Sequence, residues 1–222
     1  MSAEERVPAV FLTRAQSAGR GTRGRSFESP EGGGLYMSLL LYPEIHAKNS
    51  YTLTCAAAVA VCRAIEKECP NIAPRIKWVN DIYVGERKLA GILTEGECAE
   101  DGALRYAIVG IGINLKKAPH SPEVEAIMTS LENEGATVDA PVLSAAVTAE
   151  LIPLLGSGEV IDEYKGRSML KGREVEISSG GEYHTERVLD IDGECALITV
   201  GADGKEKRYI SGDVKVRPQK GG

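Results

Sequence analysis

Four arginines close to the N-terminus lie in a segment whose residue types could bind a phosphate group. Arg14, Arg20, Arg23 and Arg25 fall within twelve residues, and the first acidic side chain after them is Glu28. A guanidinium group can donate two hydrogen bonds to phosphate oxygens, and glycines between the arginines let the backbone approach a ligand. The segment is therefore a candidate site for ATP or an adenylate, with a solvated basic surface loop as the alternative.

The same segment matches the letters of the dinucleotide-binding motif G-x-G-x-x-G at Gly19, Gly21 and Gly24. That motif requires a helix to open within it, so that backbone N–H groups point at the pyrophosphate. Residues 27–34 contain Pro30 and three consecutive glycines, which cannot continue a helix. We therefore reject a Rossmann site and predict a flexible ligand-binding loop.

A lysine follows a predicted hairpin turn. If Gly85–Glu86 form a two-residue turn, Tyr83 faces Lys88 and Asp81 faces Ala90 across the hairpin. Because side chains alternate along a strand, these four residues are predicted to share one face. The charged face meets either a binding site or solvent, and a simply solvated lysine is the alternative.

A predicted strand over residues 106–115 carries two glycines on one face. Its core-facing positions are uniformly apolar, whereas the opposite face presents Gly110, Gly112 and Asn114. Glycine weakens a strand interior unless something approaches the backbone closely. We expect a ligand to lie over Gly110 and Gly112 with Asn114 as a polar contact, and packing of another chain segment there is the alternative.

Apolar patterns and turn residues predict an α+β protein that positions these groups. Strands are predicted at residues 7–13, 35–41, 76–78, 82–84, 88–94 and 106–115, and helices at 50–69, 141–155 and 160–164. From residue 170 onward, four short strands divided by Gly-containing turns are predicted at residues 174–178, 185–191, 196–200 and 205–210, indicating a small β-barrel. The expected division is a main domain over residues 1–169 and a second over 170–222.

Composition narrows the class of protein. A net charge of −6 disfavours a nucleic-acid binder, which needs a basic surface, and no apolar run reaches the roughly 20 residues of a membrane span. The N-terminus lacks the pattern of a secretory signal, so a cytoplasmic location is expected. Five cysteines without C-x-x-C argue against a disulfide framework or zinc site, and the seven-residue spacing of Cys55, Cys62 and Cys69 indicates one packed helix face.

Four motifs in order make the chain resemble biotin protein ligases. Residues 16–25 (QSAGRGTRGR) resemble the biotin and adenylate loop, and residues 77–81 (KWVND) resemble the K-W-P-N-D segment of that family. Residues 87–93 (RKLAGIL) and 110–114 (GIGIN) match two further family motifs. The resemblance covers most of residues 7–115, and the β-rich tail is similar to the family's SH3-like C-terminal domain.

The resemblance implies a mixed β-sheet with packed helices, the class II synthetase-like fold of biotin and lipoate ligases. It implies that ATP activates biotin as biotinyl-5'-AMP, with Mg²⁺ as cofactor, before transfer to a lysine of a biotin carboxyl carrier protein such as that of acetyl-CoA carboxylase. The implied catalytic residues are Lys88 and Arg20. Biotin would contact Gln16, Gly19, Arg20, Lys88, Gly91, Gly110 and Gly112; ATP would contact Arg23, Arg25, Phe27, Asn80 and Asn114; Asp81 would bind the metal.

Several departures from the family pattern leave alternatives open. Thr22, Phe27 and Val79 replace a common arginine, tryptophan and proline, and only residues 1–6 precede the first matched strand, where the family normally has a Ser-Thr-Asn motif and a helix. A truncated chain, a complementing partner or a changed acid specificity would each account for this. Ligation or transfer of lipoate or another acid, and non-catalytic binding of biotin or a carrier domain, remain alternatives. A DNA-binding role is not expected, and the family's monomers and dimers leave a homodimer open.

Overall fold

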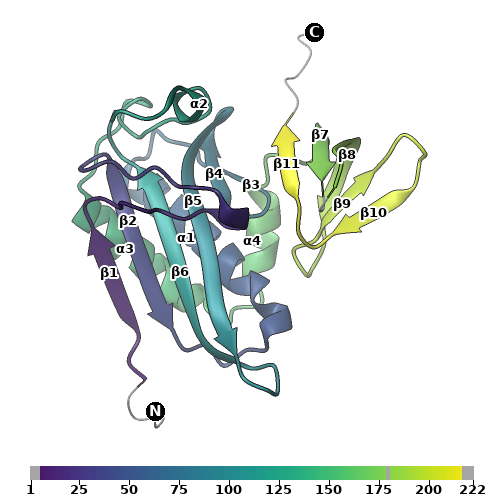
Figure 1. Ribbon diagram of the computed structural model, residues 1–222, viewed down its shortest axis with the longest axis horizontal. Helices are drawn as coiled ribbons and strands as arrows, with labels where there is room; N and C mark the ends of the chain where they lie inside the picture. The colour runs from purple at the N-terminus through teal and green to yellow at the C-terminus, as the bar shows by residue number, and fades with distance from the viewer. Residues whose placement is uncertain (1–5, 179–180, 217–222) are drawn as a thin grey trace.

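The computed structural model, which describes residues 6–178 and 181–216, has a large sheet backed by helices and a smaller sheet beside it (Figure 1). The large sheet has six strands in the order β1-β2-β6-β5-β4-β3. Their bounds are β1 Ala9–Thr13, β2 Gly34–Leu41, β3 Arg75–Lys77, β4 Asp81–Val84, β5 Arg87–Cys98 and β6 Leu104–Asn114. Each predicted strand of this domain is present within a few residues of its predicted bounds.

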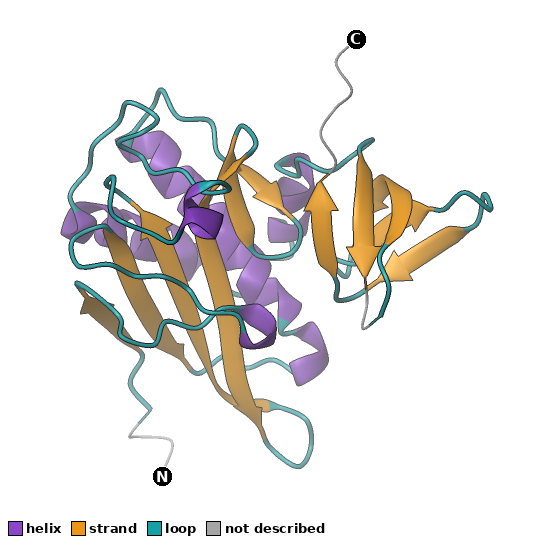
Figure 2. Cartoon of the chain, turned by 45° about the horizontal axis from the view of Figure 1, so that its top comes forward, coloured by secondary structure: helices purple, strands orange, loops and turns teal. Residues whose placement is uncertain are grey.

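Two long helices, α1 and α3, cover one face of the large sheet, the shorter α4 packs against α1, and loops cross the other face (Figure 2). The bounds of these helices are α1 Tyr51–Glu68, α3 Ala140–Leu154 and α4 Val160–Gly166. The chain also forms a short helix α2 (Pro122–Glu125) and two single 3-10 turns, η2 (Thr22–Gly24) and η3 (Ala47–Asn49). The alanine-rich α1 packs closely against the sheet, α3 and α4, and eleven of its residues are buried. All three cysteines spaced by seven are buried, which confirms the predicted packed face.

The smaller sheet has five strands in the order β10-β9-β8-β7-β11. Its bounds are β7 Glu174–Ser178, β8 His184–Ile191, β9 Leu197–Val200, β10 Glu206–Tyr209 and β11 Asp213–Val216. The sequence predicted the first four strands but not β11. The strand order has two ends, so this tail is a five-stranded antiparallel sheet, whereas a barrel was expected. Its apolar residues join the same continuous core as those of the large sheet.

The predicted α+β class is confirmed. The expectation of a mixed sheet is not, because every strand pair in the described residues is antiparallel. Parallel pairing is limited to two isolated bridges, Ile76 with Ser168 and Lys88 with Met128. The domain boundary at residue 170 stays a prediction. Within the described residues, no helix is long and apolar enough to cross a membrane.

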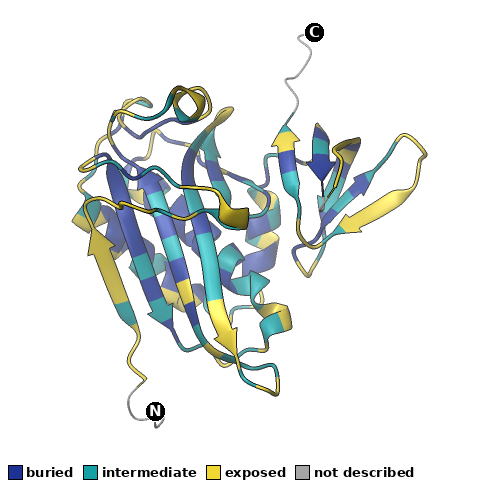
Figure 3. Ribbon diagram, in the orientation of Figure 1, coloured by how far each residue is buried: buried dark blue, intermediate teal, exposed yellow. Residues whose placement is uncertain are grey.

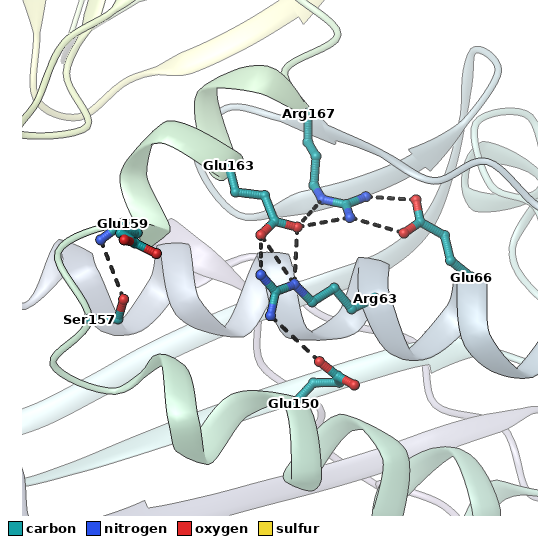
Figure 4. A network of polar contacts seen from close by, with 7 residues as sticks. All are labelled: Arg63, Glu66, Glu150, Ser157, Glu159, Glu163 and Arg167. Atoms are coloured by element: carbon teal, nitrogen blue, oxygen red, sulfur yellow. Dashed lines mark hydrogen bonds and ion pairs between the residues drawn. The ribbon is translucent and has the colours of Figure 1, made fainter.

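An ionic network fastens the helices to one another (Figure 4). The Glu163 carboxylate on α4 accepts hydrogen bonds from Arg63 on α1 and from Arg167 just after α4. Arg167 also donates two bonds to Glu66 on α1, at 2.7 and 2.9 Å, and Arg63 pairs with Glu150 on α3. The guanidinium of Arg63 lowers the pKa of Glu163, so that carboxylate is ionised at neutral pH.

Strand β1 lies at one edge of the large sheet and is largely exposed (Figure 3). Among the described strands it pairs with β2 alone, and Val10, Phe11 and Leu12 are all exposed. The core lies instead under β2, β5 and β6. The core-facing residues of β5 and β6 are buried against α1, and those of β2 are buried against α3. The well-packed centre of the sheet, rather than its edge, therefore carries the residues of the candidate site.

Candidate functional site

The N-terminal loop crosses β2, β6 and β5 on the sheet face opposite the helices (Figures 1 and 2). Residues of this loop and of these strands line a cavity of about 230 Å³. Ten of the thirteen residues predicted for the site line it: Gln16, Arg20, Arg25, Phe27, Asn80, Asp81, Lys88, Gly91, Gly110 and Gly112. It is lined further by residues that the sequence analysis did not assign, among them Met37, Ser38, Leu93, Glu95 and Ile108. The four motifs, separated by up to about a hundred residues, therefore meet in one place.

The N-terminal loop folds back on itself like a hairpin. The Phe27 N–H donates to the Gly19 carbonyl at 2.8 Å, and the Gly21 N–H donates to the Arg25 carbonyl at 2.7 Å. A Cβ on Gly19 would lie 2.2 Å from the Phe27 carbonyl oxygen, so only glycine fits there. Gly19 closes the loop and lies outside the cavity lining, and its contact with biotin stays a prediction.

Lys88 lies in the cavity wall, paired with Asp81. Its Nζ is 2.6 Å from Asp81 Oδ1, and the two side chains are 27 % and 21 % exposed. The predicted pairing of Asp81 with Ala90 is wrong: a bulge between Ile82 and Tyr83 shifts the register, so that Asp81 pairs with Gly91. Ala90 is buried in the core, and Gly91 takes its place beside Lys88.

The backbone of Lys88 is fixed by a segment about forty residues away. Its N–H donates to the Ile127 carbonyl, and its carbonyl accepts from the Thr129 N–H, both at 2.8 Å. The Asn114 side chain, expected to contact ATP, is buried and donates to the Thr129 carbonyl at 3.1 Å. Asn114 does not line the cavity; it holds the segment that in turn holds Lys88.

The Phe27 ring lies over two of the glycines that were expected to contact biotin. A Cβ on Gly112 would lie 2.5 and 2.6 Å from Phe27 ring carbons, and one on Gly91 would lie 3.3 Å from the ring. By contrast, the nearest atom to a Cβ on Gly110 is the Leu93 carbonyl oxygen, at 3.5 Å. Packing of another segment, the alternative to a ligand, therefore explains Gly112, whereas Gly110 stays open to the cavity.

The arginines of the loop differ in their surroundings. Arg20 pairs with Glu95 of β5 at 2.7 Å, and Arg25 forms an ion pair with Asp213 of β11. Arg23, in the left-handed backbone region at φ 59°, is exposed at the loop tip and does not line the cavity. The loop thus presents two arginines at the cavity, each already paired with a carboxylate.

Two polar side chains, Asn80 in the turn before β4 and Asp81 at the start of β4, complete the wall. Asn80 Nδ2 donates to the Ile92 carbonyl at 2.6 Å, which fixes β4 against β5. Asp81 is the only predicted metal ligand, and the described residues contain no group of three His, Cys, Asp or Glu side chains that could hold a metal ion. A single carboxylate suits Mg²⁺ only where substrate phosphates supply further ligands.

The sequence analysis missed a second group of charged residues next to Arg25. Lys77 and Tyr83 share a cavity with Arg25 and Asp213, and Lys77 Nζ donates to the Tyr83 hydroxyl at 3.4 Å. Burial lowers the pKa of Lys77, although Asp81 nearby acts in the opposite direction. Lys77 faces Asp81 in the β3–β4 pair. These residues are the two ends of the K-W-V-N-D motif, and this symmetry about a tight turn was the signal that could have placed Lys77 beside Asp81.

Tyr183 and Arg25 both bond to Asp213, so that this carboxylate joins the loop to the smaller sheet. Burial raises the pKa of Asp213, but the hydrogen bonds from Tyr183 and Arg25 outweigh it and lower the pKa. In turn, the bond to Asp213 raises the pKa of Arg25. The pair is therefore ionised on both sides at neutral pH.

Comparison with known proteins gives consistent matches. Residues 2–114, just over half of the chain, match the family described as "Biotin/lipoate A/B protein ligase family". The "Bifunctional ligase/repressor BirA" of Bacillus subtilis is 46 % identical over 124 residues, which are 55 % of this chain and 38 % of that protein. The chain thus spans well under two thirds of the length of that relative.

Two further matches extend over nearly the whole chain. The "Biotin--[acetyl-CoA-carboxylase] ligase" of Mycobacterium tuberculosis is 27 % identical over 216 residues, 92 % of this chain and 77 % of that protein. A solved structure of the biotin protein ligase from Aquifex aeolicus in complex with biotin and ATP superposes with a TM-score of 0.78. It is 26 % identical, and the match covers 94 % of this chain and 88 % of the other. The likeness therefore includes the smaller sheet as well as the matched motifs.

Proposed function

The chain belongs to the biotin/lipoate A/B protein ligase family, and on this basis we propose that it activates biotin with ATP and transfers the biotinyl group to a lysine of a biotin carboxyl carrier protein. The observation that carries the proposal is the position of Lys88, whose ammonium lies 2.6 Å from Asp81 in a cavity walled by glycines. The relatives named as biotin ligases and the structure with biotin and ATP support the choice of acid.

The first step joins the carboxylate of biotin to the α-phosphorus of ATP and releases pyrophosphate, which gives biotinyl-5'-AMP. Lys88 holds the carboxylate and stabilises negative charge as it develops at the reacting oxygens. Asp81 fixes the direction of the Lys88 ammonium. In the second step the amine of the carrier lysine attacks the carbonyl carbon of the mixed anhydride, and AMP leaves.

The other residues divide between the two substrates. Gln16, Gly91 and Gly110 provide a polar contact and close backbone approach on the biotin side. Arg20 and Arg25 provide cations for the phosphates, after exchanging their present carboxylate partners for phosphate oxygens. When bound with ATP, Mg²⁺ would screen the phosphate charges, and Asp81 is the carboxylate that could reach it.

The size of the cavity favours a movement of the loop when both substrates bind. At about 230 Å³ it is smaller than the roughly 300–1,000 Å³ typical of sites for small ligands, and biotin and ATP must both fit. Phe27 fills the space above Gly112, so displacement of its ring is the simplest way to enlarge the site. Phe27 then becomes available for stacking against the adenine of ATP.

Pyrophosphate release in the presence of Mg-ATP tests the proposal directly, with either biotin or lipoate supplied as the acid. Incorporation of the labelled acid into a carrier domain is the second readout. We expect biotin-dependent release that falls by about 10² to 10³ in Lys88→Met, the range for loss of one donor aimed at developing charge. Lys171→Met, which removes an exposed lysine remote from the cavity, is the matched control. Turnover with lipoate alone, or biotin binding without pyrophosphate release, would refute the proposed activity.

A further inference from the structure

Two cysteines far apart in the sequence meet in the interior of the protein. Cys55 lies on α1, and Cys195 lies in the turn between β8 and β9 of the smaller sheet. The Cys55 thiol donates to the sulfur of Cys195, with 2.9 Å between the two Sγ atoms, and the residues are 0 % and 3 % exposed. A disulfide requires an S–S distance of about 2.05 Å, so a movement of about 0.9 Å would bring the sulfurs to bonding distance.

The backbone of Cys195 is held in an unusual conformation. Its φ of 61° lies in the left-handed region, which non-glycine residues rarely adopt. The Trp78 indole Nε1 donates to the Cys195 carbonyl at 2.7 Å, and the Cys195 N–H donates to the Asp192 carbonyl at 3.1 Å. Since Trp78 is itself buried, these bonds fix the sulfur of Cys195 opposite α1.

The pairing is specific to these two cysteines. Cys62 and Cys69 repeat the helical spacing of Cys55 and are buried, but neither has a recorded contact with another thiol in the part of the chain that the structure describes. Cys98 is exposed on β5. Cys62 is buried beside Arg167 and Cys69 is buried at the end of α1, whereas Cys55 and Cys195 have the geometry of a reactive pair.

The two cysteines differ in their distance from the surface. Cys195 is one of the residues that line a surface cavity, together with Asn49, Tyr51 and Glu194, whereas Cys55 is fully buried and is not part of that lining. The hydrogen bond to Cys195, followed by burial, raises the pKa of the Cys55 thiol. Cys195 is therefore the sulfur that a small oxidant meets first, and Cys55 is placed to react second.

We propose that Cys55 and Cys195 are a redox modification site, at which a low-molecular-weight disulfide such as oxidised glutathione converts the two thiols into an intramolecular disulfide. The Cys195 thiolate attacks one sulfur of the oxidant, which forms a mixed disulfide and releases one small thiol. Cys55 then loses its proton, attacks the Cys195 sulfur and displaces the second small thiol. The protein loses two protons and two electrons, and the oxidant gains both.

The new bond would tie α1 to the smaller sheet. It closes a long loop of chain, and cross-links that close long loops restrict the unfolded state most strongly. We therefore expect the oxidised protein to melt about 10 °C higher than the reduced protein. The inference does not depend on the proposed enzymatic activity.

Mapping of the cross-link tests the proposal on the full chain. The protein is incubated with oxidised glutathione, quenched with an alkylating agent in denaturant, and digested with trypsin without reduction. Residues 49–63 and 188–205 are the tryptic peptides that contain Cys55 and Cys195, and they should be recovered as one cross-linked species. Because the first peptide also contains Cys62, the matched control is Cys62→Ser, which should still form the cross-link, as should Cys98→Ser.

The outcomes separate the alternatives. The wild-type protein should lose two alkylatable thiols and two mass units, and Cys55→Ser should instead stop at a stable mixed disulfide on Cys195. A wild-type protein in which both thiols stay alkylatable, or in which Cys62 or Cys98 replaces Cys55 in the cross-link, would overturn the proposal. Fragmentation of the wild-type cross-linked peptide identifies which of Cys55 and Cys62 carries the alkyl group and which is linked to Cys195. The test therefore decides the question even if a serine variant folds poorly.

Discussion

Substitution of Gly112 by alanine tests the central packing contact of the site. The added methyl group would lie 2.5 and 2.6 Å from Phe27 ring carbons, whereas carbon atoms in contact are ordinarily about 3.5 to 4.0 Å apart. The ring must therefore retreat by about 1 Å. Gly110 lies on the same face of the same strand, and a methyl group there meets nothing closer than 3.5 Å, which makes Gly110→Ala the matched control.

The magnitude follows from two opposing effects. Overpacking costs about 1–3 kcal/mol, and replacing glycine by alanine at an unstrained position returns about 0.4–1 kcal/mol through the unfolded state. We therefore expect Gly112→Ala to lower the free energy of unfolding by about 1–2 kcal/mol. Gly110→Ala should leave it unchanged or raise it slightly. In a Phe27→Ala background, Gly112→Ala should cost nothing, since the atoms it would strike are gone.

Urea unfolding of the four variants and the wild type gives these free energies. Trp78 is the only tryptophan and is buried, so its fluorescence reports the loss of the native core. Biotin affinity is measured in parallel, and Gly110→Ala should weaken it without loss of stability, because its methyl group enters the open part of the cavity. Equal stabilities of Gly112→Ala and Gly110→Ala, or no rescue by Phe27→Ala, would refute the reasoning.

Two further predictions concern charged contacts. Asp213→Asn should lower the free energy of unfolding by less than about 1 kcal/mol, because its ion pair with Arg25 is partly exposed. The same variant should bind ATP a few-fold more tightly in calorimetry, since Arg25 no longer has to leave a carboxylate. Weaker ATP binding would contradict this. Glu163→Gln should lower the stability by about 2 kcal/mol at pH 7 through its bonds to Arg63 and Arg167. Because the pKa of Glu163 is lowered in the folded state, its stabilising effect is present above its ordinary value of 4.5 and is lost as the pH falls below it. Unfolding curves of wild type and variant should therefore converge in acid, and a constant difference from pH 7 to pH 3 would exclude this origin.

Patterns local to the sequence predicted most elements of the fold. The alanine-rich run ending before Pro70 located α1, and the apolar alternation in residues 106–115 located β6 and its core face. Strand β11 alternates charged and apolar residues (DVKV), but it was missed because an alternation over only four residues is weak evidence for a strand. It is ordered by pairing with β7, which is adjacent in space but about 35 residues away.

The candidate site was predicted in composition but not in detail, because its geometry depends on distant contacts. The bulge that puts Gly91 beside Lys88 accompanies bonds from residues 127 and 129 to the Lys88 backbone, which spacing within the hairpin cannot reveal. Likewise, no local pattern indicates that Arg25 meets Asp213, nearly two hundred residues later. The motifs and their order were sufficient to predict ten residues that line one cavity. They did not distinguish residues at the cavity from residues such as Gly19 that hold the loop together.

The hairpin-like loop over the cavity is bonded internally through its backbone and held to the sheet mainly by side chains. The Gly21 and Phe27 amides donate within the loop, while the Arg20 and Arg25 side chains reach outward. The loop can therefore swing away as a unit without exposing those two amides. Amide hydrogen exchange at Gly21 and Phe27 would stay slow through such an opening, so protection there measures unfolding of the loop and not how often the cavity is entered.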